Sequence, residues 1–380
     1  MTLILILLIT IFIFLCFEII SINNKIKQIN YIIHVNGTRG KSSVTKYISS
    51  ILRSNNKRTL AKITGRKPTI IFPNGNKKII RRLGTARVQE QVKLIRLCSK
   101  LSINYLVVEC MSIRDELQKL ENKLFKPQIY VITNIRDDHQ EHFQGGIDDY
   151  GDVICSAIPK NATVVTSEKK YISRIKNVAS KKNSKVVEVN TEHLQNIPDG
   201  IFNSNIAIAL EVARIVGVEQ KLASKKINQI LKKEKSPIYK YKVNGNLVEL
   251  INGFSVNDVE SANDFLNYWE MKLDGFNDKI IIFNTRSDRP IRTKKFCQWI
   301  SKFTNVNKII ITGSHSYYAK RCFIKEGVEA KKILIWNAIN KLEIKKKINK
   351  LFRCKITVIG LGNEAGGVEK NMWNYLKNMN

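Results

Sequence analysis

Acidic residues are scarce in this chain of 380 residues, which has 32 Asp and Glu against 64 Lys and Arg. The formal net charge of +32 excludes an acidic or neutral enzyme that never meets polyanions. It indicates an anionic partner, which is nucleic acid, a membrane surface or a negatively charged substrate. The 43% hydrophobic content excludes intrinsic disorder, because disorder needs low hydrophobicity as well as high charge. A chain of this length is expected to form two or three domains.

Paired cysteines are also lacking. The seven cysteines are scattered, they form no C-x-x-C motif, and no histidine lies at zinc-ligand spacing from one of them. A disulfide framework and a structural zinc site are therefore excluded, and we expect reduced thiols that are mostly buried as small hydrophobic side chains.

One long apolar run opens the chain, from Leu3 to Phe17, and its extension to residue 20 adds a single charge, Glu18. About 18 helical residues span about 27 Å, close to the ~30 Å hydrocarbon core of a bilayer. A cleaved signal peptide needs basic residues before the run and a small-residue cleavage site after it, and both are lacking. Lys25 and Lys27 follow the run, so the positive-inside rule predicts a single-pass anchor over residues 1–20. The rest of the chain is then cytoplasmic at the cell membrane, and a membrane-edge or partner-bound helix is the alternative.

Beyond the anchor, short β-branched runs alternate with helical patterns, which predicts an α/β fold with a parallel sheet. A charged stretch around Ser236-Pro237 indicates a boundary, after which the alternation restarts. We expect a central domain over residues 21–236 and a smaller, Rossmann-like α/β domain over residues 237–380. The predicted strands are 31–35, 105–108, 129–133, 163–166, 185–189, 247–251, 279–283, 308–312 and 356–359, and the clearest helices are 43–55 and 86–100.

The strongest local motif is H-V-N-G-T-R-G-K-S-S at residues 34–43, which follows a predicted strand and opens a predicted helix. Its glycines let the backbone N–H groups face an anion, and the helix start adds its positive end. In such a phosphate loop Lys41 reaches the β- and γ-phosphates, and the Ser42 hydroxyl ligates Mg²⁺. The spacing G-x-x-G-K-S is two residues shorter than usual, so a turn with a fortuitous Lys-Ser is the alternative.

Two other strand ends support this interpretation. A strand at residues 106–108 delivers Glu109 at its carboxyl end, where a carboxylate faces the phosphate loop in doubly wound sheets and suits Mg²⁺. The next strand ends in T-N-I-R-D-D-H-Q-E-H, residues 133–142. His34, His139 and His142 thus follow strands at one sheet edge, and ordinary surface histidines are the alternative.

These motifs resemble the Mur ligase superfamily, the ATP-dependent amide ligases of peptidoglycan and polyglutamate synthesis. That family has a short phosphate loop, a Mg²⁺-binding glutamate after a hydrophobic strand, and a T-N…D-H-x-x-H segment whose first histidine binds metal. It also has an N-x-x-N helix start near the adenine. These features match residues 37–42, Glu109, residues 133–142 and residues 203–209.

The finer resemblance is to the ligase subunits of poly-γ-glutamate synthases, and it spans essentially the whole chain. It rests on the phosphate loop, the anchor, V-V-E-C-M at 107–111, R-R-L-G-T-A-R-V-Q-E-Q at 81–91, N-D-V-E-S at 257–261, S-D-R-P at 287–290 and G-L-G-N-E-A-G at 360–366. The extra N-terminal UDP-binding domain of peptidoglycan ligases is not expected, because only about 33 residues precede the loop.

The sequence departs from the family in three places. A carbamylated lysine that bridges metals in many relatives cannot be placed. Ile206 and Ile208 stand where smaller residues are common, and the N-D-V-E-S segment lacks an expected proline.

The resemblance implies that ATP phosphorylates a terminal γ-carboxylate and that the amine of the next glutamate attacks the acyl phosphate. The residues implied to bind ATP are Gly37, Thr38, Arg39, Gly40, Lys41, Ser42, Ser43, Asn134 and Asn205. Those implied to bind one or two Mg²⁺ ions are Ser42, Glu109 and His139. Direct catalytic roles are implied for Lys41, Glu109, His139 and Arg289. The candidates for substrate contacts are Arg82, Arg87, Asp288 and Arg289, for which a solvated basic loop and a structural turn ion pair are the alternatives.

The partners implied are glutamate and polyglutamate, the membrane and small membrane-bound synthase subunits, with a homo-oligomer as an option and no nucleic acid. A folylpolyglutamate synthase relative is one rival, which the anchor disfavours. A membrane-tethered, ATP-dependent nucleic-acid-binding or scaffold protein is another, but it leaves Glu109 and the D-H-x-x-H segment unexplained. The basic segment 169–185 also lacks the interleaved aromatic residues of a base-stacking surface.

The charge itself is unevenly distributed. Residues 19–89 hold 16 Lys and Arg and no Asp or Glu, which is half of the excess of 32. This segment contains the phosphate loop and follows the anchor. We therefore attribute the charge to an ATP site that handles a polycarboxylate beside an anionic membrane.

Overall fold

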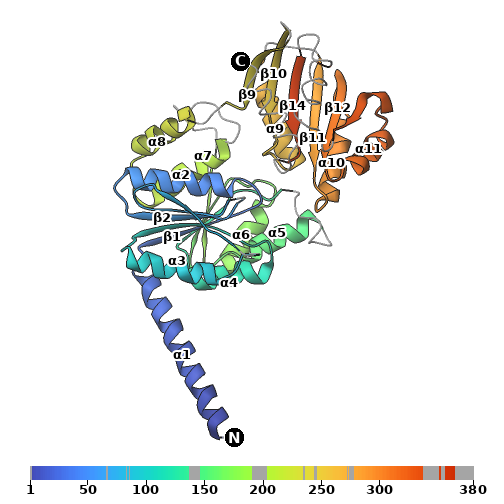
Figure 1. Ribbon diagram of the computed structural model, residues 1–380. Helices are drawn as coiled ribbons and strands as arrows, with labels where there is room; N and C mark the ends of the chain where they lie inside the picture. Colours follow the sequence, from blue (N-terminus) through green and yellow to red (C-terminus); the bar gives the residue numbers. More distant parts are fainter. Residues whose placement is uncertain are drawn as a thin grey trace. The chain divides into compact units, whose positions relative to one another are not determined.

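The computed structural model describes residues 2–65, 67–82, 84, 86–136, 146–190, 203–233, 236–243, 246–271, 273, 278–336, 351 and 356–363. The chain divides into two compact units, an N-terminal unit that reaches Lys233 and a C-terminal unit that follows it (Figure 1). Each unit is an α/β structure and is described by itself below.

The N-terminal unit is built on an eight-stranded sheet with the order β4-β3-β2-β5-β1-β6-β7-β8. Its strands pair in parallel, except that β3 is antiparallel to both of its neighbours. The central strands are continuous apolar runs because helices cover both faces of the sheet. The strands are β1 Tyr31–Asn36, β2 Thr59–Ile63, β3 Thr69–Ile71, β4 Lys77–Ile79, β5 Tyr105–Glu109, β6 Ile129–Ile132, β7 Thr163–Thr166 and β8 Lys185–Glu188.

Helices α2, α7 and α8 cover one face of this sheet, and α3, α4, α5 and α6 cover the other (Figure 1). Alternate residues of β1 serve the two layers, since Ile33 packs under α2 and Ile32 packs under α3. The helices are α2 Lys41–Ser54, α3 Gln89–Lys100, α4 Asp115–Phe125, α5 Ile147–Ser156, α6 Ile172–Lys181, α7 Asn203–Ile215 and α8 Gln220–Lys233.

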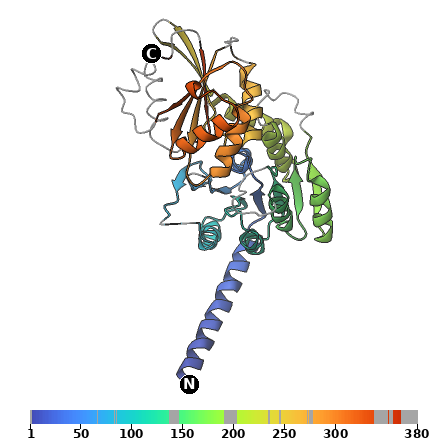
Figure 2. The same ribbon diagram turned by 90° about the vertical axis from the view of Figure 1, so that its right-hand side faces the viewer.

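Helix α1, Thr2–Lys27, precedes the sheet and extends away from it in both views (Figures 1 and 2). It is long and apolar enough to cross a membrane, with a mean hydropathy of 3.2 over its most apolar 18 residues. Its C-terminal turns belong to the folded unit, because Ile22 and Ile26 pack into the core beneath α3.

The C-terminal unit has a six-stranded sheet with the order β13-β12-β11-β14-β10-β9, parallel except for the edge strand β9. Aromatic rings fill the layer between the sheet and its helices, where Phe283 contacts Phe296 and Phe323. The elements are β9 Ile238–Val243, β10 Asn246–Asn252, α9 Val259–Glu270, β11 Lys279–Thr285, α10 Pro290–Ile300, β12 Val306–Gly313, α11 Ser316–Lys325, the 3₁₀ turn η2 Ala330–Lys332, β13 Ile333–Ile335 and β14 Ile356–Leu361.

The N-D-V-E-S segment of this unit has a local explanation that the sequence analysis missed. Asp258 precedes α9, and its carboxylate accepts a hydrogen bond from the backbone N–H of Ser261 at 2.8 Å. This N-cap satisfies a helix-end donor, so the segment starts the helix without the proline that the family led us to expect.

Candidate active site

The phosphate loop connects β1 to α2, and its two glycines are required by what lies against them. Gly37 and Gly40 have φ angles of 121° and 84°, which side chains other than glycine rarely adopt. A Cβ atom on Gly37 would lie 2.2 Å from Thr133 Oγ1, and one on Gly40 would lie 2.3 Å from Asn205 Oδ1. The loop is therefore held closely between the end of β6 and the start of α7.

Thr133 and Asn134 brace this loop from the neighbouring strand end. The Asn134 side-chain oxygen accepts from the Arg39 N–H at 3.0 Å, and its Nδ2 donates to the Arg39 carbonyl at 3.2 Å. The backbone N–H of Thr38 donates to the Asn134 carbonyl at 2.9 Å, and Thr133 Oγ1 donates to the Arg39 carbonyl at 2.5 Å. Asn134, which we predicted to bind ATP, thus fixes the loop's conformation through two side-chain hydrogen bonds.

Helix α2 begins with the lysine and the two serines of the motif. Lys41 Nζ donates to the Gly37 carbonyl at 2.5 Å and to the Thr38 carbonyl at 3.2 Å. The ammonium group therefore lies over the loop, next to the N-terminal end of α2, where an anion is favoured. Ser43 follows as the third residue of the helix and is half-buried.

Two predicted metal ligands are brought together. Ser42 Oγ donates to Glu109 Oε2 at 2.8 Å, although 67 residues separate them in the chain. Glu109 ends β5, is only 3% exposed, and also accepts from the Thr64 N–H at 2.8 Å. A hydroxyl and a carboxylate oxygen are ligands that Mg²⁺ prefers, so this pair fits the ion.

The other residues predicted for the ATP site are placed as follows. Asn205 lies in the first turn of α7 against Gly40, is 5% exposed, and its Oδ1 has no hydrogen-bond partner in the part of the chain that is described. His139, predicted as the third metal ligand, lies outside the described residues, as does His142.

Of the two arginines predicted to contact substrate in this unit, Arg82 is held by a carboxylate of the protein. Arg82 forms two hydrogen bonds to the carboxylate of Glu90, at 2.7 and 2.8 Å. Glu90 also contacts Lys62 Nζ at 3.0 Å, and the Lys62 side chain is buried beside Gln91. Arg82 is thus already engaged by a carboxylate of its own chain.

Opposing influences act on the ionisable groups of this cluster. Burial alone would raise the pKa of Glu90, but hydrogen bonds from Arg82 and Lys62 lower it to about 2. Burial lowers the pKa of Lys62. Arg87 lies two residues before α3, and its side chain is exposed. A carboxylate from solution can therefore reach it.

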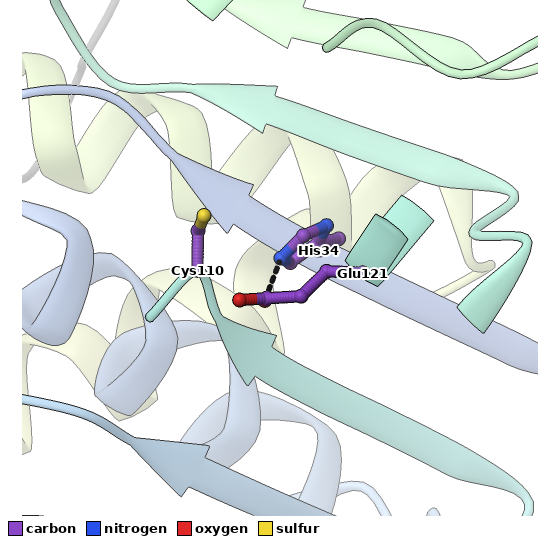
Figure 3. A group of neighbouring side chains, drawn as sticks. All are labelled: His34, Cys110 and Glu121. Atoms are coloured by element: carbon purple, nitrogen blue, oxygen red, sulfur yellow. Dashed lines mark hydrogen bonds and ion pairs between the residues drawn. The ribbon is translucent and has the colours of Figure 1, made fainter. Parts of the chain in front are cut away.

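A buried polar cluster lies on the other side of β1, under α4, and sequence analysis missed most of it (Figure 3). His34 Nδ1 is 2.6 Å from Asn122 Oδ1, and its Nε2 is 3.2 Å from Glu121 Oε2. The Asn122 amide is oriented by a bond from its Nδ2 to the Ala157 carbonyl. Both ring nitrogens of His34 therefore have a hydrogen-bond partner on α4.

Cys110 completes this cluster, and its sulfur lies within 4.8 Å of the facing atoms of His34 and Glu121. Burial raises the pKa of the Cys110 thiol well above its usual range, and the thiol donates to the Ser112 carbonyl. We interpret the three side chains as a hydrogen-bonded cluster that ties α4 to the strand beneath the phosphate loop, because each already has a partner within the protein.

In the C-terminal unit, the predicted substrate residues follow β11. Arg286, which sequence analysis did not single out, holds the carboxylate of Asp288 through bonds of 2.8 and 2.5 Å. These bonds lower the pKa of Asp288. Arg289 lies 3.9 Å from the same carboxylate and directly precedes α10.

Comparison with known families agrees with this architecture. Residues 35–215 match the Mur ligase middle domain, and residues 238–379 match the C-terminal domain of the poly-γ-glutamate synthase CapB. Similar solved structures include a folylpolyglutamate synthase from Thermotoga maritima, with a TM-score of 0.57 and 14% identity over 96% of this chain and 93% of that one. They also include MurF from Acinetobacter baumannii, with a TM-score of 0.62 and 15% identity over 92% of this chain and 77% of that one. At these identities the structures establish the fold alone.

Two curated relatives cover most of both chains. The capsule biosynthesis protein CapB of Bacillus anthracis is 26% identical over 90% of this chain and 76% of its own length. The PGA synthase CapB of Bacillus subtilis (strain 168) is 27% identical over 89% of this chain and 88% of its own length. The chain is therefore an ATP-dependent amide-bond ligase that joins a Mur ligase middle domain to the C-terminal domain of the poly-γ-glutamate synthase CapB.

Proposed function

We propose that this protein polymerises glutamate through its γ-carboxyl group at the expense of ATP. The observation that carries the proposal is the pairing of Ser42 with Glu109 beside Lys41, within a chain whose C-terminal part matches the CapB domain. The curated relatives are named for capsule biosynthesis and for PGA synthesis, and they match both units of this chain.

The first step transfers the γ-phosphoryl group of ATP to a carboxylate. A γ-carboxylate oxygen of glutamate or polyglutamate forms a bond to the γ-phosphorus, the bond to the β–γ bridging oxygen breaks, and ADP leaves. The N-terminal end of α2 and Lys41 hold the phosphates in place and offset the negative charge that the two anions bring together. Mg²⁺ bound by Ser42 and Glu109 would supply further charge neutralisation at the phosphates.

The second step forms the amide. The amine of the incoming glutamate attacks the carbonyl carbon of the acyl phosphate, phosphate leaves with the electron pair of the broken C–O bond, and the nitrogen loses a proton. Repulsion between two carboxylate substrates opposes this encounter, so basic side chains that contact them are needed. We propose that Arg87 and Arg289 contact substrate carboxylates, and that the engaged pairs around Arg82 and Asp288 position their loops.

We further propose that α1 anchors the enzyme in the cell membrane with both units in the cytoplasm. Lys25 and Lys27 at the inner end of the helix support this orientation. Small membrane-bound synthase subunits are the proposed partners, since the polymer must be handled at the membrane.

Isotope transfer tests the proposed intermediate. Membranes that carry the full chain and its partner subunits are supplied with ATP, Mg²⁺ and glutamate labelled with ¹⁸O in both γ-carboxyl oxygens. An acyl phosphate transfers one labelled oxygen to inorganic phosphate for each amide bond, which ³¹P NMR detects. Unlabelled phosphate released together with polymer would overturn the mechanism, and the Lys41→Ala chain provides the background rate.

A further inference from the structure

The junction between α1 and the N-terminal unit is rigid rather than a flexible linker. Helix α1 continues without a break from its apolar part into contacts with α3 and α4. Glu18 accepts from Arg96 of α3 at 2.6 Å, and Asn23 accepts from Lys126, directly after α4, at 2.9 Å. Ile26 is buried against the same helices.

The length of the apolar segment fixes where this junction lies. Leu3 to Phe17 comprise 15 residues, which span only about 22 Å as a helix, less than the ~30 Å hydrocarbon core. Glu18, the residue that follows, already contacts the folded unit. If α1 spans the membrane, the ends of α3 and α4 next to it are held at the level of the lipid headgroups.

Both helices present basic side chains at this place. On α3 three basic residues share one helical face at i, i+3 and i+7, and on α4 two share a face at i and i+4, with a third at the helix end. All six are exposed, and one of each set contacts α1. We call them the basic surface, which consists of Lys93, Arg96, Lys100, Lys119, Lys123 and Lys126.

Acidic side chains offset this charge only in part, since Glu18 pairs with Arg96 and Asp115 pairs with Lys119. The acid of α3, Glu90, is turned inward to Lys62. Of the three acids of α4, Glu121 is buried beside His34, and Asp115 and Glu116 lie in the first turn of the helix. Leu120, on the same helix, is 43% exposed among the lysines. Basic residues interspersed with an exposed leucine are the composition of surfaces that rest on anionic bilayers.

We propose that the basic surface binds the anionic headgroups of the membrane that α1 crosses, and so holds the N-terminal unit against the bilayer. The inference rests on the proposed anchoring by α1, but it adds a second and separable contact. Each lysine near an anionic membrane surface strengthens binding to that surface about fivefold. Several of them fix the orientation of the unit, which a single helix leaves free to tilt.

The test is amine labelling of the full chain in nanodiscs of neutral phosphatidylcholine or of phosphatidylcholine with phosphatidylglycerol. A water-soluble succinimidyl ester modifies exposed lysines, and mass spectrometry reports each site. We expect Lys93, Lys100 and Lys123 to be labelled about fivefold more slowly in the anionic discs, and high salt should remove the difference. Lys225 and Lys232, exposed on α8 across the sheet, are internal controls and should not change.

Variants separate a lipid contact from a general effect of charge. In a chain with Lys93→Glu, Lys100→Glu and Lys123→Glu, the remaining Lys119 should lose its protection. The matched variant with three substitutions on α8 (Lys221→Glu, Lys225→Glu and Lys232→Glu) should keep it. Equal labelling in the two lipids would overturn the proposal. Resistance to carbonate extraction tests the anchor by itself, so that failure of the anchor is recognised independently.

Discussion

The two units place comparable loops at the carboxyl ends of parallel strands, but they equip them differently. In the N-terminal unit the N–H groups of Gly37, Thr38 and Arg39 in the loop after β1 are bonded within the protein rather than open to an anion as expected, and α2 begins with Lys41 and Ser42. In the C-terminal unit the loop after β11 leads to α10, which begins with Pro290 and so lacks a free N–H at that position. The first loop thus offers a lysine and a serine at the start of its helix, and the second offers the charged side chains of Arg286, Asp288 and Arg289, so the two loops differ in the groups available to a ligand.

Each unit also has a bidentate arginine–carboxylate pair, and their surroundings differ. Arg82 and Glu90 are 19% and 17% exposed, and they lie beside the buried Lys62. Arg286 and Asp288 are 41% and 53% exposed. Removing a partner from the first pair leaves a buried charge uncompensated, whereas water replaces a partner in the second.

The largest expected effect is that of Lys41→Ala. Loss of its ammonium group should lower ATP-dependent ligation by at least about 10²-fold to 10³-fold, because it removes a preorganised charge at the transferred phosphate. Lys46→Ala, at an exposed position of the same helix, is the control and should leave the rate unchanged. An active Lys41→Ala enzyme would mean that the N-terminal loop is not the phosphate site.

The next effect concerns the metal pair. Glu109→Gln keeps the shape of the side chain but removes its charge, so we expect the Mg²⁺ concentration for half-maximal activity to rise about tenfold or more. A Mg²⁺ titration of initial rates measures this. Glu116→Gln, at an exposed position of α4, is the control and should leave this Mg²⁺ concentration unchanged. Identical titration curves for the two variants would show that Glu109 is not a metal ligand.

Two glycines with nearly the same φ angle allow backbone strain to be distinguished from the steric clash of an added Cβ atom. Gly40 and Gly75 have φ angles of 84° and 85°, but a Cβ would meet Asn205 only at Gly40 and has open space at Gly75. Urea unfolding should show that Gly75→Ala costs about 1 kcal/mol and that Gly40→Ala costs more. Asn205→Ala in the Gly40→Ala background should recover part of the difference. Equal losses would show that the loop is not packed as described.

The last comparison concerns the two arginine–carboxylate pairs. The pKa of Glu90 is lowered to about 2 from an ordinary value of 4.5, so its contribution is present above pH 4.5 and is lost as the pH falls towards 2. Glu90→Gln should lower the unfolding free energy by about 2 kcal/mol at pH 7, with the difference from wild type shrinking below pH 4.5.

Asp288→Asn is the exposed counterpart and should change the unfolding free energy by less than about 1 kcal/mol. Chemical denaturation of both variants across this pH range makes the comparison. A larger effect for Asp288→Asn would reverse our assignment of the two pairs.

The parts that sequence predicted well are those encoded by neighbouring residues. Continuous β-branched runs gave β1, β5 and β11, and the G-x-x-G-K-S spacing placed the loop between a strand and a helix. Glu109 could be positioned from its strand, because the carboxyl ends of parallel strands share one edge. Strands β2, β3, β4, β9 and β13 were not predicted, because they are short or have lysines within their apolar runs.

The remaining features depend on contacts between distant segments. Glu121 is 87 residues from His34, and nothing in the local pattern of α4 marks it as a partner for a buried histidine. The family resemblance made Arg82 a candidate for substrate contact, and the structure shows that Glu90, the second residue of α3, holds it through two hydrogen bonds. Tertiary packing determines which side chains pair in this way, and the spacing of residues along the sequence does not reveal it.

Ligation by membranes that contain the full chain and its partner subunits tests the central claim most directly. ATP, Mg²⁺ and glutamate are supplied, and γ-linked polymer and ADP are measured together. We predict one ADP for each γ-amide bond, with both products abolished in Lys41→Ala. ATP consumption without γ-linked glutamate, or polymer formation that survives Lys41→Ala, would contradict the account.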